Sequence, residues 1–184
     1  EEGEENDNPE WESSLEVTKS GGVKSTAANI LTILENDPNL KGAFAYNEFT
    51  HRAAIVRDLP WRKREEDGED CFREVDDSGL RYYMESTYGI TSSAKIQDAL
   101  NLAINKCAFH PVREYLNSLR WDGQKRLETV FSDYLGVADT AYTRSTARKS
   151  LVAAVARVFN PGVKYDYVPI IVGDQGIGKS TLLR

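Results

Sequence analysis

The sequence predicts a mainly α protein of the α+β class with a small β-hairpin, followed by the first part of an α/β domain. Three observations lead to this class. Apolar residues recur at helical spacing over much of residues 25–163, and two short β-forming runs, 42–46 and 53–56, interrupt that pattern. Residues 167–172 then form an apolar, β-branched run that is typical of a buried parallel strand, and glycines follow it directly.

These patterns divide the chain into four predicted segments. They are an acidic disordered tail (1–24), a small α+β accessory module (25–108), a helical collar region (109–163) and the start of an α/β domain (164–184). The net charge of −6 belongs to the tail, because residues 1–16 carry eight acidic side chains and no basic one. A segment so poor in apolar residues does not offset its ordering entropy, which predicts disorder.

The accessory module begins with a helix over residues 27–35, which Ser25 or Thr26 caps. After the hairpin and the charged loop 62–70, for which a solvated loop is favoured over a nucleic-acid contact, a helix over 78–88 ends at Gly89. A third helix follows a cap at Thr91 or Ser92. Its apolar residues recur on one face and predict core positions for Ile96, Leu100, Ala103, Ile104 and Cys107.

The collar region is predicted to be helical, with a turn at residues 120–123. Its first helix has Pro111 in the first turn, its second ends at Gly136, and its longest runs from Asp139 or Thr140 to Phe159. We expect these apolar residues of the first and longest helices to face inward: Val112, Tyr115, Leu116, Leu119, Leu151, Val152, Val155, Val158 and Phe159.

Two arginines of the longest helix, Arg144 and Arg148, lie near its positive end, where an anion is needed to balance them. Ion pairs with carboxylates elsewhere in the fold are the favoured explanation. A nucleotide of an adjoining subunit or a nucleic-acid backbone is the alternative anion.

The glycine-rich stretch after residue 172 fits the spacing G-x-x-x-x-G-K-[ST] of a phosphate-binding loop, the Walker A motif. Its glycines allow successive backbone N–H groups to point at phosphate oxygens. Lys179, the predicted catalytic residue, supplies a cation for the β- and γ-phosphates, and Ser180 is the predicted Mg²⁺ ligand. The predicted ATP-binding residues are Gly173, Asp174, Gln175, Gly176, Ile177, Gly178, Lys179, Ser180 and Thr181.

Phosphoryl transfer at such a loop also requires an acidic residue on a second strand, a group that orients water and usually an arginine finger. None of these follows Ser180 in the sequence. A lone parallel strand also lacks partners. We therefore expect this chain to be the front part of a larger protein and to be inactive alone.

Other features of the sequence indicate in which cellular compartment the protein acts and whether it binds a metal ion. The chain shows no secretory signal and no apolar run long enough to span a bilayer, so we expect no membrane association. Cys71 and Cys107 are far apart and lack metal-ligand spacing, as expected of reduced thiols in cytoplasm. A zinc site that joins them to His51 and His110 matches no ligand pattern and is disfavoured.

Taken together, the segments resemble the virulence-associated protein E family of phage and prophage replication proteins. The resemblance implies an ATPase core of the AAA+ or superfamily 3 helicase kind, a ring homo-oligomer, an attached primase module and action on single-stranded DNA or a replication fork. It also implies the cytoplasm of a bacterium or of a phage-infected cell. It is carried by YNEF (46–49), LPW (59–61), YGI (88–90), HPVREYLNSLRWDG (110–123), YLG (134–136), RKSLVAAVARVFNPG (148–162) and VGDQGIGKST (172–181).

The sequence thus predicts the N-terminal part of an ATP-dependent DNA helicase or replication protein, with ATP and Mg²⁺ as its cofactors. One alternative is a truncated adaptor that binds DNA or protein without hydrolysing nucleotide. A small-molecule or nucleoside kinase is disfavoured, because such kinases carry the loop near the start of the chain.

Overall fold

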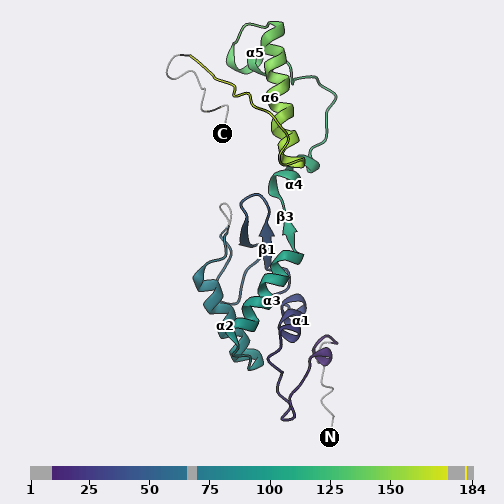
Figure 1. Cartoon of the computed structure of the whole chain (residues 1–184), viewed down its shortest axis with the longest axis vertical. Helices are drawn as coiled ribbons and strands as arrows, with labels where there is room; N and C mark the ends of the chain where they lie inside the picture. The colour runs from purple at the N-terminus through teal and green to yellow at the C-terminus, as the bar shows by residue number, and fades with distance from the viewer. Residues whose placement is uncertain (1–9, 66–69, 174–180, 182–184) are drawn as a thin grey trace. The chain divides into compact units, whose positions relative to one another are not determined.

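The computed structural model describes residues 10–65, 70–173 and 181, and the chain forms two compact units, Glu1–Pro111 and Val112–Arg184 (Figure 1). The described part is mainly helical with a small mixed sheet, which confirms the α+β character. The elements of the first unit are η1 (Glu12–Ser14), α1 (Ala27–Asn36), β1 (Phe44–Asn47), β2 (Arg52–Ile55), α2 (Glu74–Tyr88), α3 (Ser93–Lys106) and β3 (Ala108–Phe109). The later elements are α4 (Pro111–Ser118), α5 (Val130–Leu135) and α6 (Ala141–Phe159).

The sheet of the first unit has the strand order β2-β1-β3. The predicted hairpin is confirmed, because β1 and β2 pair antiparallel with Phe44 opposite Ile55. The third strand was not predicted. Its two residues follow α3 directly and pair parallel with β1, Ala108 opposite Tyr46, and a strand of two residues is too short to show a period in the sequence.

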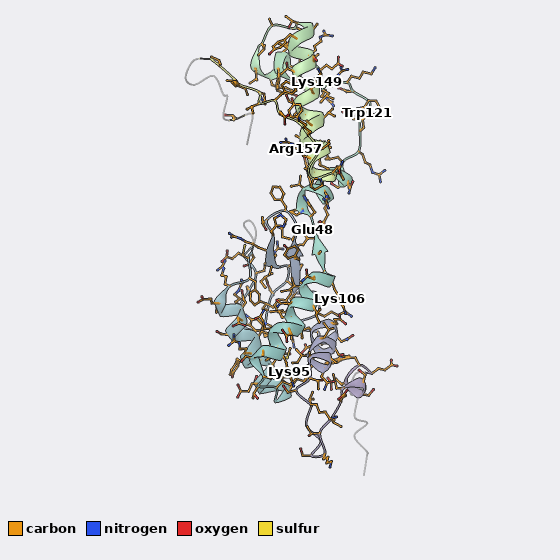
Figure 2. The ribbon with its side chains drawn as sticks, viewed as in Figure 1. Glu48, Lys95, Lys106, Trp121, Lys149 and Arg157 are labelled. Carbon is orange, nitrogen blue, oxygen red and sulfur yellow. The ribbon has the colours of Figure 1, made fainter. Side chains whose placement is uncertain are left out.

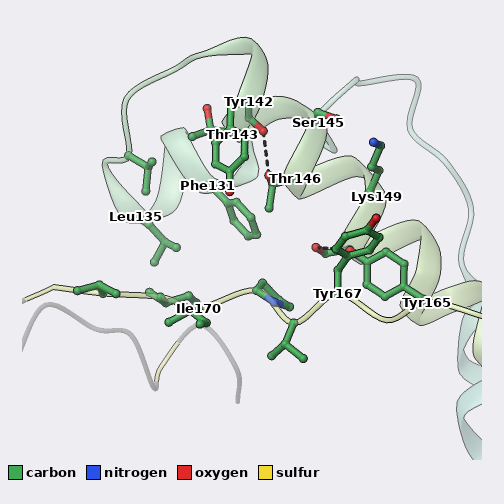
Figure 3. A pocket seen from close by; sticks show the side chains of 16 residues that line it. Phe131, Leu135, Tyr142, Thr143, Ser145, Thr146, Lys149, Tyr165, Tyr167 and Ile170 are labelled. Atoms are coloured by element: carbon green, nitrogen blue, oxygen red, sulfur yellow. Dashed lines mark hydrogen bonds between the residues drawn. The ribbon is translucent and has the colours of Figure 1, made fainter.

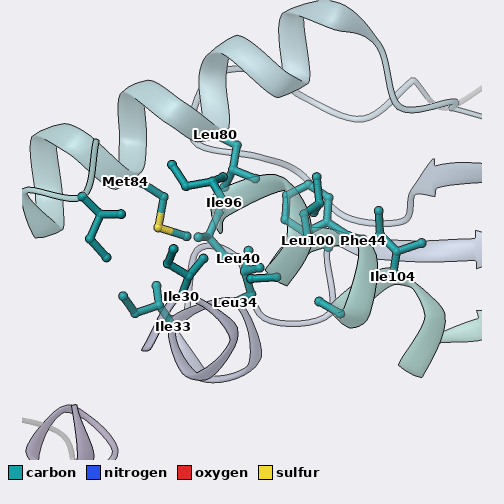
Figure 4. Packing of buried hydrophobic residues seen from close by; sticks show 14 of the residues in the cluster. Ile30, Ile33, Leu34, Leu40, Phe44, Leu80, Met84, Ile96, Leu100 and Ile104 are labelled. Carbon is teal, nitrogen blue, oxygen red and sulfur yellow. The ribbon is translucent and has the colours of Figure 1, made fainter. Parts of the chain in front are cut away.

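The core of the first unit lies between α1, α2, α3 and the sheet (Figure 4). The α1 helix begins where predicted, since the Thr26 hydroxyl accepts a hydrogen bond from the Asn29 N–H at 3.2 Å. The fully buried aliphatic side chains are Ile30, Ile33, Leu40, Ile55, Leu80, Met84, Ile90, Ile96 and Leu100. Four of the five predicted core residues of α3 are buried, but Cys107 is exposed because it lies past the last helical residue, Lys106.

Residues 10–24, which the sequence assigns to a disordered tail, are folded onto this core. Leu15 is buried, and Trp11 packs against the same cluster. Asn29 of α1 fixes the segment, because its amide exchanges two hydrogen bonds with the backbone of Glu16, at 2.9 and 2.8 Å, and donates a third to the Lys24 carbonyl at 3.0 Å.

A buried ion cluster joins the loop after β2 to α2. Arg62 donates two hydrogen bonds to each of two carboxylates, Asp70 at 2.6 and 2.9 Å and Asp76 at 2.6 and 2.9 Å. Both carboxylates are fully buried, with 0% exposed side chains. The expectation of a merely solvated loop over 62–70 is therefore wrong for Asp70, whereas Lys63, Arg64 and Glu65 are exposed. Asp76 also accepts from the Arg73 N–H at 2.9 Å, which starts α2 four residues before the predicted position.

The hydrogen bonds from Arg62 hold the pKa of the Asp70 carboxyl below its ordinary value, against the effect of burial. Burial acts to raise the pKa of Asp76, but its bonds from Arg62, the Arg73 N–H and Trp61 outweigh that effect and lower it. A lowered pKa in the folded state means that these carboxylates stabilise the fold above about pH 4 and lose that effect as the pH falls further.

The second unit is a helical hairpin with little core of its own. The α5 helix ends as predicted, at Gly136, which is in the left-handed region (φ +65°). The α6 helix begins as predicted, with Thr140 as its cap. The only residues of α4, α5 and α6 that are buried are Ala147 and Ala153. The prediction that α4 and α6 turn their larger apolar residues inward is wrong for the six that are exposed, Tyr115, Leu119, Leu151, Val152, Val155 and Phe159. The other three, Val112, Leu116 and Val158, are half-buried. Figure 2 labels Lys149, Arg157 and Trp121 in this unit.

No helix in the described part of the chain is both long enough and apolar enough to cross a bilayer.

Replacing Arg62 with methionine (R62M) is expected to lower the free energy of unfolding at pH 7 by about 3–5 kcal/mol, because two buried carboxylates lose their counter-ion. The loss should shrink as the pH falls, since protonation removes the uncompensated charge. Urea unfolding between pH 4 and pH 8 measures both effects. The control is R64M, which removes an exposed arginine. Equal stability of R62M and R64M would contradict the prediction.

Replacing Gly79 with alanine is expected to destabilise the first unit by about 1–3 kcal/mol. Alanine normally stabilises the interior of a helix relative to glycine. Here, however, the added Cβ would lie 2.4–2.6 Å from three carbon atoms of the Trp61 indole. Thermal unfolding followed by circular dichroism measures the change, and Ser78→Ala on the exposed side of the same helix is the control. A higher melting temperature for G79A would show that Trp61 moves freely.

Candidate functional site

The candidate site lies in the second unit and is built on the α6 helix. The Thr140 hydroxyl accepts from the Thr143 N–H at 3.1 Å, and the Thr143 hydroxyl accepts from the Thr140 N–H at 2.9 Å. This reciprocal capping satisfies two backbone donors at the helix start. It fixes the direction in which α6 leaves α5, so that the two helices pack together.

The chain after α6 turns back along the helix. Gly162 makes the turn with φ +94°, a conformation that favours glycine. Two contacts then hold the returning segment: the Tyr165 hydroxyl lies 3.1 Å from the Ser150 hydroxyl, and the Arg157 guanidinium donates to the Tyr165 carbonyl at 2.8 Å. The Tyr165 and Tyr167 rings are 5.6 Å apart, edge to face. The segment is thus anchored up to Tyr165.

A cavity of about 790 Å³ lies between the α5–α6 hairpin and residues 165–172 (Figure 3). Its walls are partly aromatic and partly polar. The side chains on which its chemistry depends are Phe131, Tyr142, Thr146, Lys149, Tyr167 and Ile170. Lys149 brings a cation to the rim and has no ion pair among the described residues. The last residue of the wall, Val172, directly precedes the glycine-rich motif.

The motif itself is only partly within the described residues. Gly173 and Thr181 are described, and both are exposed. The other predicted ATP-binding residues lie outside the described residues: Asp174, Gln175, Gly176, Ile177, Gly178, the predicted catalytic Lys179 and the predicted Mg²⁺ ligand Ser180. The phosphate-binding role of the motif therefore stays a prediction.

The predicted buried strand over residues 167–172 is not formed. These residues have no regular secondary structure, and most of their side chains are in solvent, with Val168 81%, Ile170 82% and Val172 87% exposed, while Ile171 is half-buried. A strand exists only when a neighbour pairs with its backbone. None of the described strands does so here, because all three belong to the sheet of the first unit.

Arg144 and Arg148 of α6 both form ion pairs with carboxylates. This is the explanation that the sequence favours for two arginines near the start of a helix. Arg144 binds Asp139 through two bonds of 2.6 and 2.5 Å, and Arg148 lies 3.3 Å from Glu128. The hydrogen bonds from Arg144 lower the pKa of the Asp139 carboxyl. Both pairs are on the surface, so they contribute little to stability.

Within the described residues, no group of three or more histidine, cysteine or acidic side chains is arranged to hold a metal ion. Cys71 is half-buried and Cys107 exposed, and both are free thiols.

The cavity is the feature that sequence reasoning missed. Its wall combines residues of α5, of α6 and of the returning segment, and only the fold brings these together. One signal was available, because the breaker Asn160-Pro161-Gly162 after a long helix indicates a reversal of the chain. That reversal places the residues before the motif beside the helix.

The two units define a class of protein: an α+β unit followed in the chain by a helical hairpin. Residues 116–184, most of the second unit, match the model of the virulence-associated protein E-like domain. This part of the chain is therefore similar to that domain. No curated protein matches the chain.

Replacing Arg157 with methionine should loosen the returning segment, because the only described hydrogen bond to the Tyr165 carbonyl is removed. A net contribution of about 1 kcal/mol corresponds to a roughly fivefold larger population of the released segment, and therefore to roughly fivefold faster cleavage by chymotrypsin after Tyr165 or Tyr167. Limited proteolysis followed by mass spectrometry measures it. Arg148→Met, on the same helix but paired with Glu128, is the control. An unchanged cleavage rate in R157M would show that Tyr165 is held by its hydroxyl alone.

Proposed function

We propose that this chain is part of an ATP-dependent DNA helicase or replication protein of phage or mobile-element type, and that residues 173–181 bind the triphosphate. The observation that carries the proposal is the order of the chain: a Walker A spacing comes directly after an apolar segment, 167–172, whose side chains are exposed. An apolar, β-branched segment in this state is suited to pair with other strands of a parallel sheet. The family match over 116–184 supports the same interpretation.

In the proposed site, each residue type has a defined task. The backbone N–H groups between Gly173 and Gly178 surround the β-phosphate, and Lys179 stabilises charge on the γ-phosphate. The Ser180 hydroxyl is a ligand of Mg²⁺, and Thr181 contacts the α- or β-phosphate. Catalysis then consists of positioning and of charge stabilisation, since the protein forms no covalent bond to the phosphoryl group.

The cavity beside the motif gives the rest of the nucleotide a place to bind. Val172 belongs to the cavity wall and directly precedes Gly173, the first residue of the motif, so a nucleotide held at its phosphates would have its base near the cavity mouth. The volume of about 790 Å³ is in the range of small-molecule sites. Tyr142 and Tyr167 offer aromatic faces for stacking, and Thr146 and Lys149 offer polar contacts.

The remaining parts of the proposal concern the setting. The protein acts on DNA, single-stranded or at a replication fork, as a ring homo-oligomer in the cytoplasm of a bacterium or an infected cell, with a primase module as a partner. The adaptor without nucleotide chemistry remains the competing function. The first unit supports this alternative, because it forms a core of its own that does not require the motif.

Binding of a fluorescent ATP analogue to the chain in the presence of Mg²⁺ distinguishes the two functions. We expect saturable binding that EDTA weakens, and a roughly 10- to 100-fold weaker affinity for Lys179→Ala, because this substitution removes a charge-assisted hydrogen bond to phosphate. Lys164→Ala is the control, since Lys164 is an exposed lysine of the same unit paired with Asp166.

Two results would overturn the nucleotide proposal. One is no binding of the analogue by the wild-type chain at millimolar concentration. The other is equal affinity of the K179A and K164A variants, which would place the ligand elsewhere. Either result favours the adaptor.

A further inference from the structure

We propose that the turn at residues 120–126 is a contact site for single-stranded DNA, in which the Trp121 indole stacks on a base and Arg120 and Lys125 contact the backbone phosphates. The site lies on the loop between α4 and α5, where Figure 2 labels Trp121. The inference rests on the proposed function for the choice of DNA as the nucleic acid. The turn itself supplies the stacking surface and the charges.

The first observation is the exposure of a large aromatic side chain. Trp121 is 75% exposed, whereas the other two tryptophans, Trp11 and Trp61, pack against the core of the first unit. Leaving an indole in water forgoes the stabilisation that its burial would give, so an exposed tryptophan suggests a binding role.

The second observation is that the turn is built to hold this side chain. The Trp121 indole N–H donates to the Gln124 carbonyl at 3.2 Å, and the Gln124 N–H donates to the Asp122 carboxylate at 3.0 Å. Arg126 binds both oxygens of that carboxylate, at 3.0 and 2.6 Å, and Gly123 takes φ +85°. These bonds fix the turn before any ligand arrives, which lowers the entropic cost of binding.

The charges around the indole favour an anionic partner. Asp122, the only acid between 115 and 127, is paired with Arg126, and that bond lowers the pKa of its carboxyl to about 2, so the pair stays intact at neutral pH. Arg120 and Lys125 are exposed and have no ion pair within the described residues. Two cations of the same turn therefore have no compensating charge within the described residues.

The charge of the whole unit points the same way. The second unit carries eleven basic and seven acidic side chains, whereas the first unit carries twelve basic and twenty-two acidic side chains. Attraction of a polyanion therefore favours the second unit. An exposed aromatic face combined with cations is the means by which proteins bind single strands without sequence preference, since every base has a π-face and every nucleotide a phosphate.

The same geometry selects against a duplex and against an apolar protein surface. In a duplex the faces of the bases are covered by their neighbours, so an indole on a short turn has no face to stack on. A protein that covered Trp121 would also desolvate Arg120 and Lys125, which lack carboxylates to pair with within the described chain.

The test is a titration of the chain, without nucleotide, with a fluorescein-labelled oligothymidylate, followed by anisotropy and by tryptophan fluorescence. We expect quenching of the wild-type fluorescence and a roughly 5- to 100-fold weaker affinity for Trp121→Ala, the range expected when one base is no longer stacked on an aromatic ring. Trp121→Phe keeps a stacking ring and should retain most of the affinity while the quenching disappears. Tyr115→Ala, which removes an exposed aromatic of α4, is the control.

The phosphate contacts are tested by salt. Arg120→Ala and Lys125→Ala should each weaken binding and flatten the dependence of log affinity on log salt, by about 0.7 for each phosphate that is no longer neutralised on a single strand. Circular dichroism of each variant checks that the unit is folded.

Three results of the titration would overturn the proposal: no binding of the oligothymidylate, equal or tighter binding of the same sequence as a duplex, or an unchanged affinity in W121A. A fourth is that W121A changes the oligomeric state of the chain but not its affinity for DNA, which would make Trp121 a protein contact. The titration contains no nucleotide, and the ATP-analogue titration contains no DNA. Failure of this proposal is therefore separate from failure of the proposed nucleotide site.

Discussion

The second unit is governed by one constraint: the backbone of residues 167–172 needs strand partners before its apolar side chains can be buried. A buried peptide group without a hydrogen-bond partner costs more than burial of the side chain returns. Within the described chain the segment stays beside α6 with Ile170 and Val172 in solvent. The anchor at Tyr165, made by Arg157 and Ser150, fixes where the segment starts.

The first unit solves the opposite problem, because its polar groups are buried and must be satisfied. Arg62 meets both Asp70 and Asp76, and this cluster ties the loop after β2 to the start of α2. Asp37, at the end of α1, accepts from the Tyr83 and Tyr88 hydroxyls at 2.7 Å each, which ties α1 to α2. Truncating one partner of such a network leaves a buried charge, so these contacts determine which arrangement of helices is stable.

Features of the fold that depend on local chemistry could be predicted from the sequence. The helix caps and the left-handed glycines at 89 and 136 act within one helical turn, and the structure has both glycines where the sequence places them. Of the two candidates that the sequence offers for each cap, the structure uses Thr26 and Thr140. Features that depend on distant partners could not be predicted. The burial of Asp70, the pairing of β3 and the exposed faces of α4 and α6 follow from tertiary contacts, which a periodicity in one segment does not encode.

The candidate sites of the second unit are joined by one contact. Arg148 of α6 lies 3.3 Å from Glu128, which belongs to the same α4–α5 loop as Trp121, and the next residue of α6, Lys149, lines the cavity. Two ligands affect each other's binding affinity when each of them shifts an element that the other also contacts. The change in affinity that the first ligand causes for the second is then equal to the change that the second causes for the first. If nucleotide and DNA bind as proposed, α6 is that element. An exposed ion pair contributes little to stability, so its removal would alter the coupling while leaving the fold intact.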